Sequence, residues 1–332
     1  MLLTKTYKTI KVYLPVRTKV NLPGRAKADL LATNTCLTWK STACSTLRHI
    51  SFRRLQFVHS AHFERTYFDM IPNCILLILI VVVIQPGKSQ RLANFEGAHV
   101  ALIGWTDPTD GSIKFDCTGS YLGRNMILTG ARCLERNGTR ANVVRLGEAI
   151  GLPRDFEVDN VSVHYRYQAE YYYHNMAIIF LKENPQMVSS RFKPACIFSV
   201  EPPLDIKVHV VGRDSRGSFQ KTSVDLVGSD KCHEYYTPTK KFKYGALLVC
   251  CMCARNPTTQ NCASELASPM QTILEKNGKR VPFLVGQKTI GKSCGSKIPG
   301  IYTRLSSDGH LPWISTIAAM DFKDHDACIE RY

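Results

Sequence analysis

Short apolar segments recur along the chain between about residues 94 and 304, and each is rich in branched aliphatic or aromatic residues. Glycine, proline, asparagine and aspartate separate them, and no long stretch of helical period interrupts them. The segments are 99–105, 125–130, 142–146, 176–181, 207–212, 282–287 and 300–305. Many short strands divided by turn residues are typical of an all-β sandwich or barrel.

The pattern changes near the carboxyl end, where a helix is predicted. Ser307 and Asp308 supply an N-cap signal. The apolar residues that follow at helical spacing are Leu311, Ile314, Ile317 and Ala318. The sequence therefore predicts an all-β domain that ends in one helix.

The strongest apolar run, residues 71–84, lies ahead of the β segments. It is shorter than the roughly 20 residues that a comfortable membrane span needs, and it suits the apolar region of a signal peptide. Small residues at Gly87 and Ser89 predict cleavage after Ser89, and Met70 stands where an initiator would belong. The alternative interpretation is a type II membrane anchor.

The net charge of +16 is concentrated at the amino end. Residues 1–69 hold 12 Lys and Arg against 3 Asp and Glu, a composition typical of disorder. We expect this leader to be disordered or absent from the mature protein. Because so much of the excess charge lies there, the rest of the chain gives little reason to expect a nucleic-acid partner.

Ten of the 13 cysteines lie between Cys117 and Cys328. An even set of scattered cysteines indicates disulfides and an oxidising compartment. Zinc is the alternative, with ligands from Cys232, His233, Cys250, Cys251 and Cys253. The paired spacing of a zinc site is missing, so we expect neither a metal nor a cofactor. Sequons at Asn137 and Asn160 would suit a secreted glycoprotein.

Seven motifs, in order, resemble the trypsin/chymotrypsin-like serine proteases. They occupy 115–133, 144–148, 173–181, 192–198, 210–214, 262–270 and 284–305. The resemblance covers roughly residues 95–320. It implies two six-stranded antiparallel β-barrels, a C-terminal helix and a cleft between the barrels.

The resemblance also locates the three catalytic positions, and this sequence departs from the family at each. Arg132 stands at the position of the general base, and a guanidinium has no acceptor atom. Asn175 stands at the position of the carboxylate that orients the base, and Leu266 at that of the nucleophile. Ser264, Ser268 and His174 lie nearby, but we expect them to be ordinary loop residues.

Activation also differs from the family pattern. Family zymogens are cut before Ile-Val-Gly-Gly, and the new amino terminus pairs with an Asp beside the nucleophile. Here that tetrapeptide is missing, while Glu265 stands at the Asp position and Ser264 replaces the usual glycine. The resemblance therefore leaves Glu265 without an expected partner.

The specificity pocket is partly kept in the resemblance. Gly291 and Gly300 match the glycines that leave room for a substrate side chain, and Gln260 stands at the base of the pocket. Thr289 and Ile290 lie on the substrate-binding strand, where a peptide could still add by main-chain hydrogen bonds.

Three disulfides follow from the resemblance: Cys117–Cys133, Cys232–Cys253 and Cys262–Cys294. Cys196–Cys328 is a further suggested pair, which would tie the inter-barrel segment to the tail. The adjacent Cys250 and Cys251 have no place in this scheme.

The sequence therefore predicts a leader (1–69), a signal peptide (70–89) and one secreted protease-homologue domain (90–332). By resemblance, we expect a non-catalytic protein that acts as cofactor, decoy or adaptor in an extracellular proteolytic cascade of innate immunity. Its partners would be proteins or peptides, with no membrane contact after signal cleavage. The alternatives are an active endopeptidase and a membrane-anchored binding protein.

Overall fold

The computed structural model describes residues 92–214, 216–246, 250–256, 265–291 and 296–332, together with the backbone of a short hairpin. The chain divides into two compact units, 1–83 and 84–332. In the first unit the hairpin pairs β1 (Lys19–Asn21) with β2 (Lys27–Asp29). The apolar run 71–84, the Ser89 cleavage site, Gln260, Ser264 and the Cys262–Cys294 pair lie outside the described residues.

The first half of the second unit is a closed six-stranded barrel, in the order β10-β5-β4-β3-β8-β9. Its strands are β3 (Val100–Thr106), β4 (Ile113–Gly123), β5 (Met126–Thr129), β8 (Val143–Leu146), β9 (Arg154–Val163) and β10 (Ala177–Leu181). The strands pair antiparallel throughout. Inward side chains such as Ile103, Tyr121 and Phe156 are almost fully buried and form its core.

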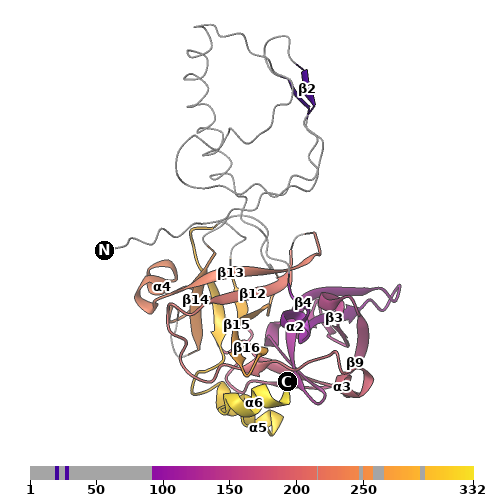
Figure 1. Ribbon diagram of the computed structural model, residues 1–332. Helices are drawn as coiled ribbons and strands as arrows, with labels where there is room; N and C mark the ends of the chain where they lie inside the picture. The colour runs from indigo at the N-terminus through magenta and orange to yellow at the C-terminus, as the bar shows by residue number, and fades with distance from the viewer. Residues whose placement is uncertain are drawn as a thin grey trace, which may run out of the picture. The chain divides into compact units, whose positions relative to one another are not determined.

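The second half is a sheet in the order β11-β16-β15-β12-β13-β14-β17. Because β16 also pairs with β17, six of these strands close into a second antiparallel barrel, and β11 adds to β16 in parallel. The strands are β11 (Cys196–Ile197), β12 (Val208–Arg213), β13 (Phe219–Val227), β14 (Cys251–Arg255), β15 (Pro269–Lys276), β16 (Lys279–Ile290) and β17 (Gly300–Arg304). Figure 1 shows the two barrels side by side.

The remaining elements are short. They are α2 (Asn94–Gly97), η2 (Ala131–Cys133), β6 (Glu135–Arg136), β7 (Thr139–Arg140), η3 (Glu148–Ile150), α3 (Pro185–Val188), α4 (Ser229–Tyr235), α5 (Leu311–Ala318) and α6 (His325–Arg331). No helix in the described ranges is long and apolar enough to cross a bilayer.

The two-barrel fold with a C-terminal helix confirms the predicted architecture. The start of α5 differs from the sequence prediction, because His310 is the N-cap residue and Pro312 lies in the first turn. Ser307 lies one turn earlier, where its carbonyl accepts hydrogen bonds from the backbone N–H groups of His310 and Leu311 at 3.0 and 3.1 Å. A following helix, α6, was not predicted.

Three disulfides join the elements: Cys117–Cys133, Cys196–Cys328 and Cys232–Cys253. They are the pairs that the sequence suggested within the described residues. Cys196–Cys328 closes a long loop, with a sequence separation of 132 residues, and fixes α6 against β11. Cys232 and Cys253 are bonded to each other, so their sulfurs are not the thiolate ligands that a zinc site would need.

Candidate functional site

Arg132, Asn175 and the 266–267 segment meet around Gly130. The backbone N–H of Arg132, in η2, donates to Oδ1 of Asn175 at 2.9 Å. A side chain on Gly130 would come within 3.0 Å of the Asn175 amide and 3.5 Å of the Cβ of Ala267. A larger residue at position 130 would therefore push against the Asn175 amide. The fold brings together the residues that the sequence singled out.

Asn175 is a structural joint between the two barrels. It is 1% exposed and lies two residues before β10 of the first barrel. Its backbone carbonyl accepts a hydrogen bond at 2.8 Å from Nε2 of Gln287, which lies on β16 of the second barrel. The same Nε2 donates to the carbonyl of Thr129 at 3.0 Å. The side chain and the backbone of Asn175 are thus both held by neutral hydrogen bonds.

Arg132 is partly exposed and stacks on an aromatic ring. Its guanidinium carbon lies 4.7 Å from the centre of the Tyr172 ring, within the range of a cation–π contact. A guanidinium has five donors and no acceptor, and it does not lose its proton in proteins. This side chain can therefore hold a positive charge in place, but it cannot accept a proton.

Leu266 packs instead of facing a reactant. Its partly buried side chain contacts the core of the first barrel, and the residue forms a β-bridge with Cys117. Its carbonyl accepts hydrogen bonds from the backbone N–H and the hydroxyl of Thr118, at 2.9 and 3.1 Å. The side chain has no heteroatom and so offers no nucleophile.

The loop around Leu266 is fixed from both sides. Ser268 is fully buried, and its hydroxyl donates to the carbonyl of Glu265 at 2.9 Å. Lys288 of β16 exchanges backbone hydrogen bonds with this loop, donating to Ser268 at 2.9 Å and accepting from Ala267 at 2.8 Å. Ser268 is thus committed to holding the loop, as the sequence led us to expect of an ordinary loop residue.

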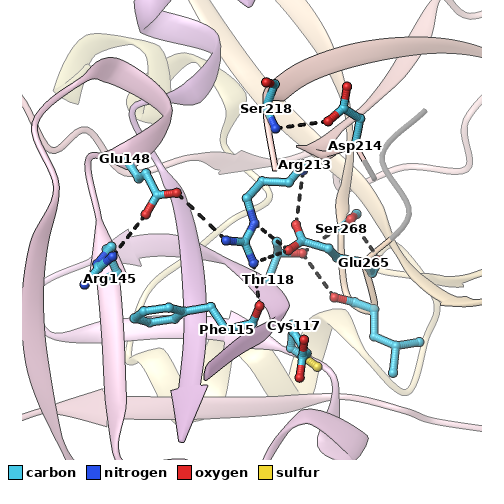
Figure 2. A network of polar contacts seen from close by, with 12 residues as sticks. Phe115, Cys117, Thr118, Arg145, Glu148, Arg213, Asp214, Ser218, Glu265 and Ser268 are labelled. Atoms are coloured by element: carbon cyan, nitrogen blue, oxygen red, sulfur yellow. Dashed lines mark hydrogen bonds and ion pairs between the residues drawn. The ribbon is translucent and has the colours of Figure 1, made fainter. Parts of the chain in front are cut away.

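Glu265 has a partner that the sequence did not predict. It forms an ion pair with Arg213 at the end of β12, with Nη2 of Arg213 2.6 Å from Oε1 and Nε 2.7 Å from the same oxygen. The backbone N–H of Arg213 also donates to Oε2 of Glu265 at 3.1 Å. Figure 2 shows the guanidinium aimed at this carboxylate. The two side chains are only 18% and 10% exposed, so the pair is largely desolvated.

The ion pair continues into the first barrel. Nη2 of Arg213 donates to the carbonyl of Phe115 at 2.5 Å, and Nη1 lies 3.9 Å from Glu148. Glu148 in turn contacts Arg145 at 3.4 Å (Figure 2), and Arg145 binds Asp155 through two nitrogens. One arginine therefore links the 265–268 loop to β4 and η3. No local sequence signal pointed to this, because Arg213 and Glu265 lie 52 residues apart.

The His174 side chain contacts two other histidines. Its Nδ1 lies 2.9 Å from Nε2 of His310, and the Nδ1 of His310 lies 2.6 Å from the carbonyl of Arg304. His164 stacks on His174 and contacts the carbonyl of Gly309 at 3.0 Å through Nε2. Burial lowers the pKa of His310 to about 3 and that of His174 to about 4, so the imidazoles are neutral.

These three histidines are the described residues best arranged to hold a metal ion, since one ring nitrogen from each lies within 4.8 Å of the others. Carbonyl contacts at His164 and His310 also explain the cluster as a hydrogen-bonded part of the core. In either case His174 is committed to this cluster and cannot serve as a base beside Leu266.

Elsewhere among the described residues, Ser199 after β11 contacts His325 of α6. The hydroxyl of Ser199 lies 3.0 Å from Nε2 of His325, and the backbone N–H of Ser199 donates to the same nitrogen at 3.1 Å. The His325 ring packs against Phe198 and Phe283. This contact docks α6 onto β11 and β16. Because the backbone N–H occupies the acceptor nitrogen, the imidazole is not poised to take the serine proton.

Gly291 and Gly300, which the resemblance assigned to the pocket wall, approach each other closely. A side chain on Gly291 would lie 3.1 Å from the Cα of Gly300, so the two glycines lie close together. Ile290 pairs with Ile301 across β16 and β17. Thr289 is buried, and its hydroxyl contacts that of Thr303 at 2.6 Å. The Gln260 base of the pocket lies outside the described residues.

The start of the domain is anchored on the second barrel by another buried carboxylate. Glu96 of α2 is 1% exposed and binds Nζ of Lys221 at 2.7 and 2.9 Å. It also accepts the backbone N–H of Ala93 at 2.9 Å. Lys221 and the Ala93 backbone N–H lower the pKa of this carboxyl despite its burial, which raises it. Residues 93–97, before β3, are thus held by Lys221 on β13 of the second barrel.

Two closed barrels, joined beside Asn175 and Leu266, define a protein of the serine-protease fold. A family model described as Trypsin matches residues 96–314, and the chain belongs to this family. The curated relatives include "Serine protease snk" of Drosophila melanogaster, 28% identical over 68% of this chain and 54% of the relative. "CLIP domain-containing serine protease C9" of Anopheles gambiae is 26% identical over 67% and 65%.

The chain thus spans about half to two thirds of the length of these two relatives. Among solved structures, mouse neuropsin matches with a TM-score of 0.52 at 18% identity, covering 70% of this chain and 99% of its own. Kallikrein-related peptidase 10 matches with a TM-score of 0.53 at 16% identity, covering 70% and 100%. At these identities the structures establish the fold alone.

Proposed function

We propose that this protein is a non-catalytic member of the trypsin family that binds other proteins of an extracellular proteolytic cascade, as a cofactor, decoy or adaptor. One observation carries the proposal. The segments that meet around Gly130 present Arg132, Asn175 and Leu266, which offer no proton acceptor, no carboxylate and no nucleophile. Peptide hydrolysis would need a proton acceptor, a carboxylate and a nucleophile at these three positions to act together on one substrate.

The magnitude of the loss supports inactivity. In a serine protease, removal of one member of the catalytic set lowers turnover by about 10⁴ to 10⁶, and the members act as one unit. Here all three proposed positions are changed. The nearby alternatives, Ser268 and His174, are held in other contacts, so a substituted pair is not assembled among the described residues.

A binding role is supported by the contacts that hold the segments around the three positions in place. Arg213 holds Glu265, so the loop that carries Leu266 needs no newly cut amino terminus to be ordered. Tyr172 and Ile290, at the end of β16, pack against the same apolar cluster, and Arg132 stacked on Tyr172 adds one fixed positive charge there. A peptide that adds a strand there would be recognised mainly by its backbone.

Secretion belongs to the same proposal. The apolar run 71–84 fits a signal peptide, and the three disulfides suit an oxidising compartment. The glycosylation proposal is supported by Asn137 and Asn160, which are both exposed. Recovery of the protein from culture medium would support secretion, whereas retention in the detergent fraction would favour a membrane-anchored binding protein.

The experiment that tests inactivity is labelling with a fluorophosphonate probe, which reacts only with an activated serine. We expect no labelling of the secreted full chain, with trypsin as the positive control. Labelling that is lost on heating would overturn the proposal in favour of an active endopeptidase. L266S should also stay unlabelled, because it restores a nucleophile without a base.

The triple variant R132H/N175D/L266S restores the family residues and so tests whether 132, 175 and 266 are the catalytic positions. If the three residues are correctly assigned, this variant should react with the probe, whereas L266S should not. The binding half is tested by surface plasmon resonance with purified clip-domain serine proteases as analytes. Loss of signal in R132A, with the fold intact, would place the contact at this surface, and no signal from wild type would count against these partners.

A further inference from the structure

Cys250 and Cys251 are adjacent in sequence and unusually close through their side chains. Their Sγ atoms lie 2.8 Å apart, and the residues are 0% and 4% exposed. Non-bonded carbon atoms prefer a separation of about 3.5–4.0 Å, and sulfur is larger than carbon. Two unbonded thiols would therefore not rest at this distance. The short separation indicates that the surrounding structure holds the two sulfurs in position for a bond.

The backbone on both sides of the pair is fixed. The carbonyl of Cys250 accepts the backbone N–H of Arg304 at 3.0 Å, and Cys251 pairs with Thr303 at the start of β14. Two residues on, Cys253 is bonded to Cys232. These contacts leave the two sulfurs facing each other in a closed apolar cluster. The cluster includes Tyr173, Phe242, Ala246 and Ile301.

The other described cysteines are already bonded in pairs: Cys117–Cys133, Cys196–Cys328 and Cys232–Cys253. The compartment that forms these bonds would also oxidise an adjacent pair of thiols. The two thiols differ in acidity, since the hydrogen bond from Cys251 lowers the pKa of Cys250 while that of Cys251 is raised. Cys250 is thus the thiol that ionises first.

We propose that Cys250 and Cys251 form a disulfide between neighbouring residues in the secreted protein. During folding, the Cys250 thiolate attacks a disulfide oxidant such as glutathione disulfide and releases one glutathione thiolate. The Cys251 thiol then loses its proton and attacks Sγ of Cys250, which releases the second glutathione thiolate. The protein loses two electrons and two protons, and the oxidant is reduced to two thiols.

The bond would lie at the point where the chain enters β14. This strand pairs with β17, whose first residue is the pocket glycine Gly300. A ring closed between neighbouring residues restricts the backbone locally and closes no long loop, so its effect on global stability is small. Its consequence is local stiffness behind the pocket wall.

Peptide mapping of the full secreted chain tests the proposal. The protein is unfolded in iodoacetamide without reductant, digested with trypsin and measured by mass spectrometry. Cleavage releases 244–255, which we expect to be joined to 232–240 through Cys253–Cys232. The joined peptides should carry no alkyl group and be two hydrogen masses lighter than the same pair with two thiols. Two alkyl groups added before reduction would overturn the proposal.

Matched variants distinguish this bond from shuffled pairs. C250S and C251S should each leave one thiol on 244–255, which takes up one alkyl group, while Cys232–Cys253 stays intact. Linkage of either remaining cysteine to another peptide would contradict the assignment. If a variant is not secreted, fragmentation of the joined wild-type peptides between Cys251 and Cys253 decides, because it shows whether 232–240 is attached to Cys253 or to one of the adjacent pair.

Discussion

The two barrels hold their sides of the site by different physical means. On the side of the first barrel, Arg132 and Asn175 are held by neutral hydrogen bonds, one from the Arg132 backbone and one from Gln287 of the second barrel. The second barrel holds the loop at Leu266 through a largely desolvated ion pair, Arg213–Glu265. Neutral hydrogen bonds contribute modestly to stability, whereas one member of a buried ion pair cannot be removed without leaving a charge unpaired.

This difference shows which parts of the fold depend on catalytic chemistry and which do not. Asn175 keeps a position in the joint between the barrels with an amide, so a carboxylate is not needed there for folding. Glu265 is held in place by its ion pair with Arg213. The frame of the site can therefore persist after the proposed loss of hydrolysis. Substitutions on the two sides should differ in their cost.

The largest effect is expected from breaking the ion pair. R213M should lower the free energy of unfolding by about 3–5 kcal/mol, because the Glu265 carboxylate stays in a desolvated place without its partner. The measurement is urea unfolding followed by tryptophan fluorescence. The double variant R213M/E265M should recover much of the loss, since it removes both charges.

The matched control for the ion pair is K182M, which breaks the exposed contact between Lys182 and Glu157. Solvent already screens that pair, so no measurable change is expected. Equal losses in R213M and K182M would show that the Arg213–Glu265 contact does not carry the loop.

The second expected effect is acid sensitivity from buried neutral histidines. Burial lowers the pKa of His310 to about 3 and that of His174 to about 4. The unfolded chain takes up these protons near pH 6.5 and the folded chain does not, so stability is full above pH 6.5 and falls as the pH drops. Between pH 6.5 and its lowered pKa, each imidazole that stays neutral in the folded chain lowers the free energy of unfolding by about 1.4 kcal/mol for each pH unit.

Urea midpoints at pH 7.5, 6.0 and 5.0 measure this slope. H310Q should flatten it by about one proton, since the glutamine amide can still donate to the Arg304 carbonyl but does not titrate. A slope unchanged in H310Q would mean that His310 is not the group that resists protonation. His99, also buried, has its pKa lowered to about 4 and should account for part of the remaining slope.

The sequence was a good guide to the elements and a poor one to the contacts between them. The short apolar segments predicted the strands of an all-β sandwich or barrel, because side-chain period and turn residues are local signals. The family resemblance implied that these strands close into two barrels, as the structure shows. The family resemblance placed Arg132, Asn175 and Leu266 in one neighbourhood. The partner of Glu265 was missed, because Arg213 lies at the end of a strand 52 residues away and pairs only when the barrel closes.

The histidine cluster was missed for the same physical reason. His164 and His174 lie on either side of a tyrosine-rich loop, and His310 precedes the last long helix. Nothing in the spacing of the three residues predicts that one ring nitrogen of each lies within 4.8 Å of the others. The N-cap of α5 was misplaced by a related error, because Ser307 gave the expected local signal one turn before the helix begins.

The third prediction concerns the neutral side of the comparison. N175A should lower the free energy of unfolding by about 1–3 kcal/mol, less than R213M, because the backbone N–H of Arg132 loses its acceptor without leaving a buried charge. Urea unfolding in the same buffer measures the difference. A loss larger than that of R213M would reverse the comparison between the barrels.

The smallest effect is expected at the surface of the site, where Arg132 stacks on Tyr172. Y172A should cost about 0.5–1 kcal/mol of this cation–π energy at a partly exposed position, and Y172F should cost little, because the ring face remains. Comparing R132A, Y172A and the double variant in a cycle isolates the coupling between the two side chains. A coupling near zero would show that the Arg132 charge is held by its backbone alone, and the proposed binding surface would then lose its fixed cation.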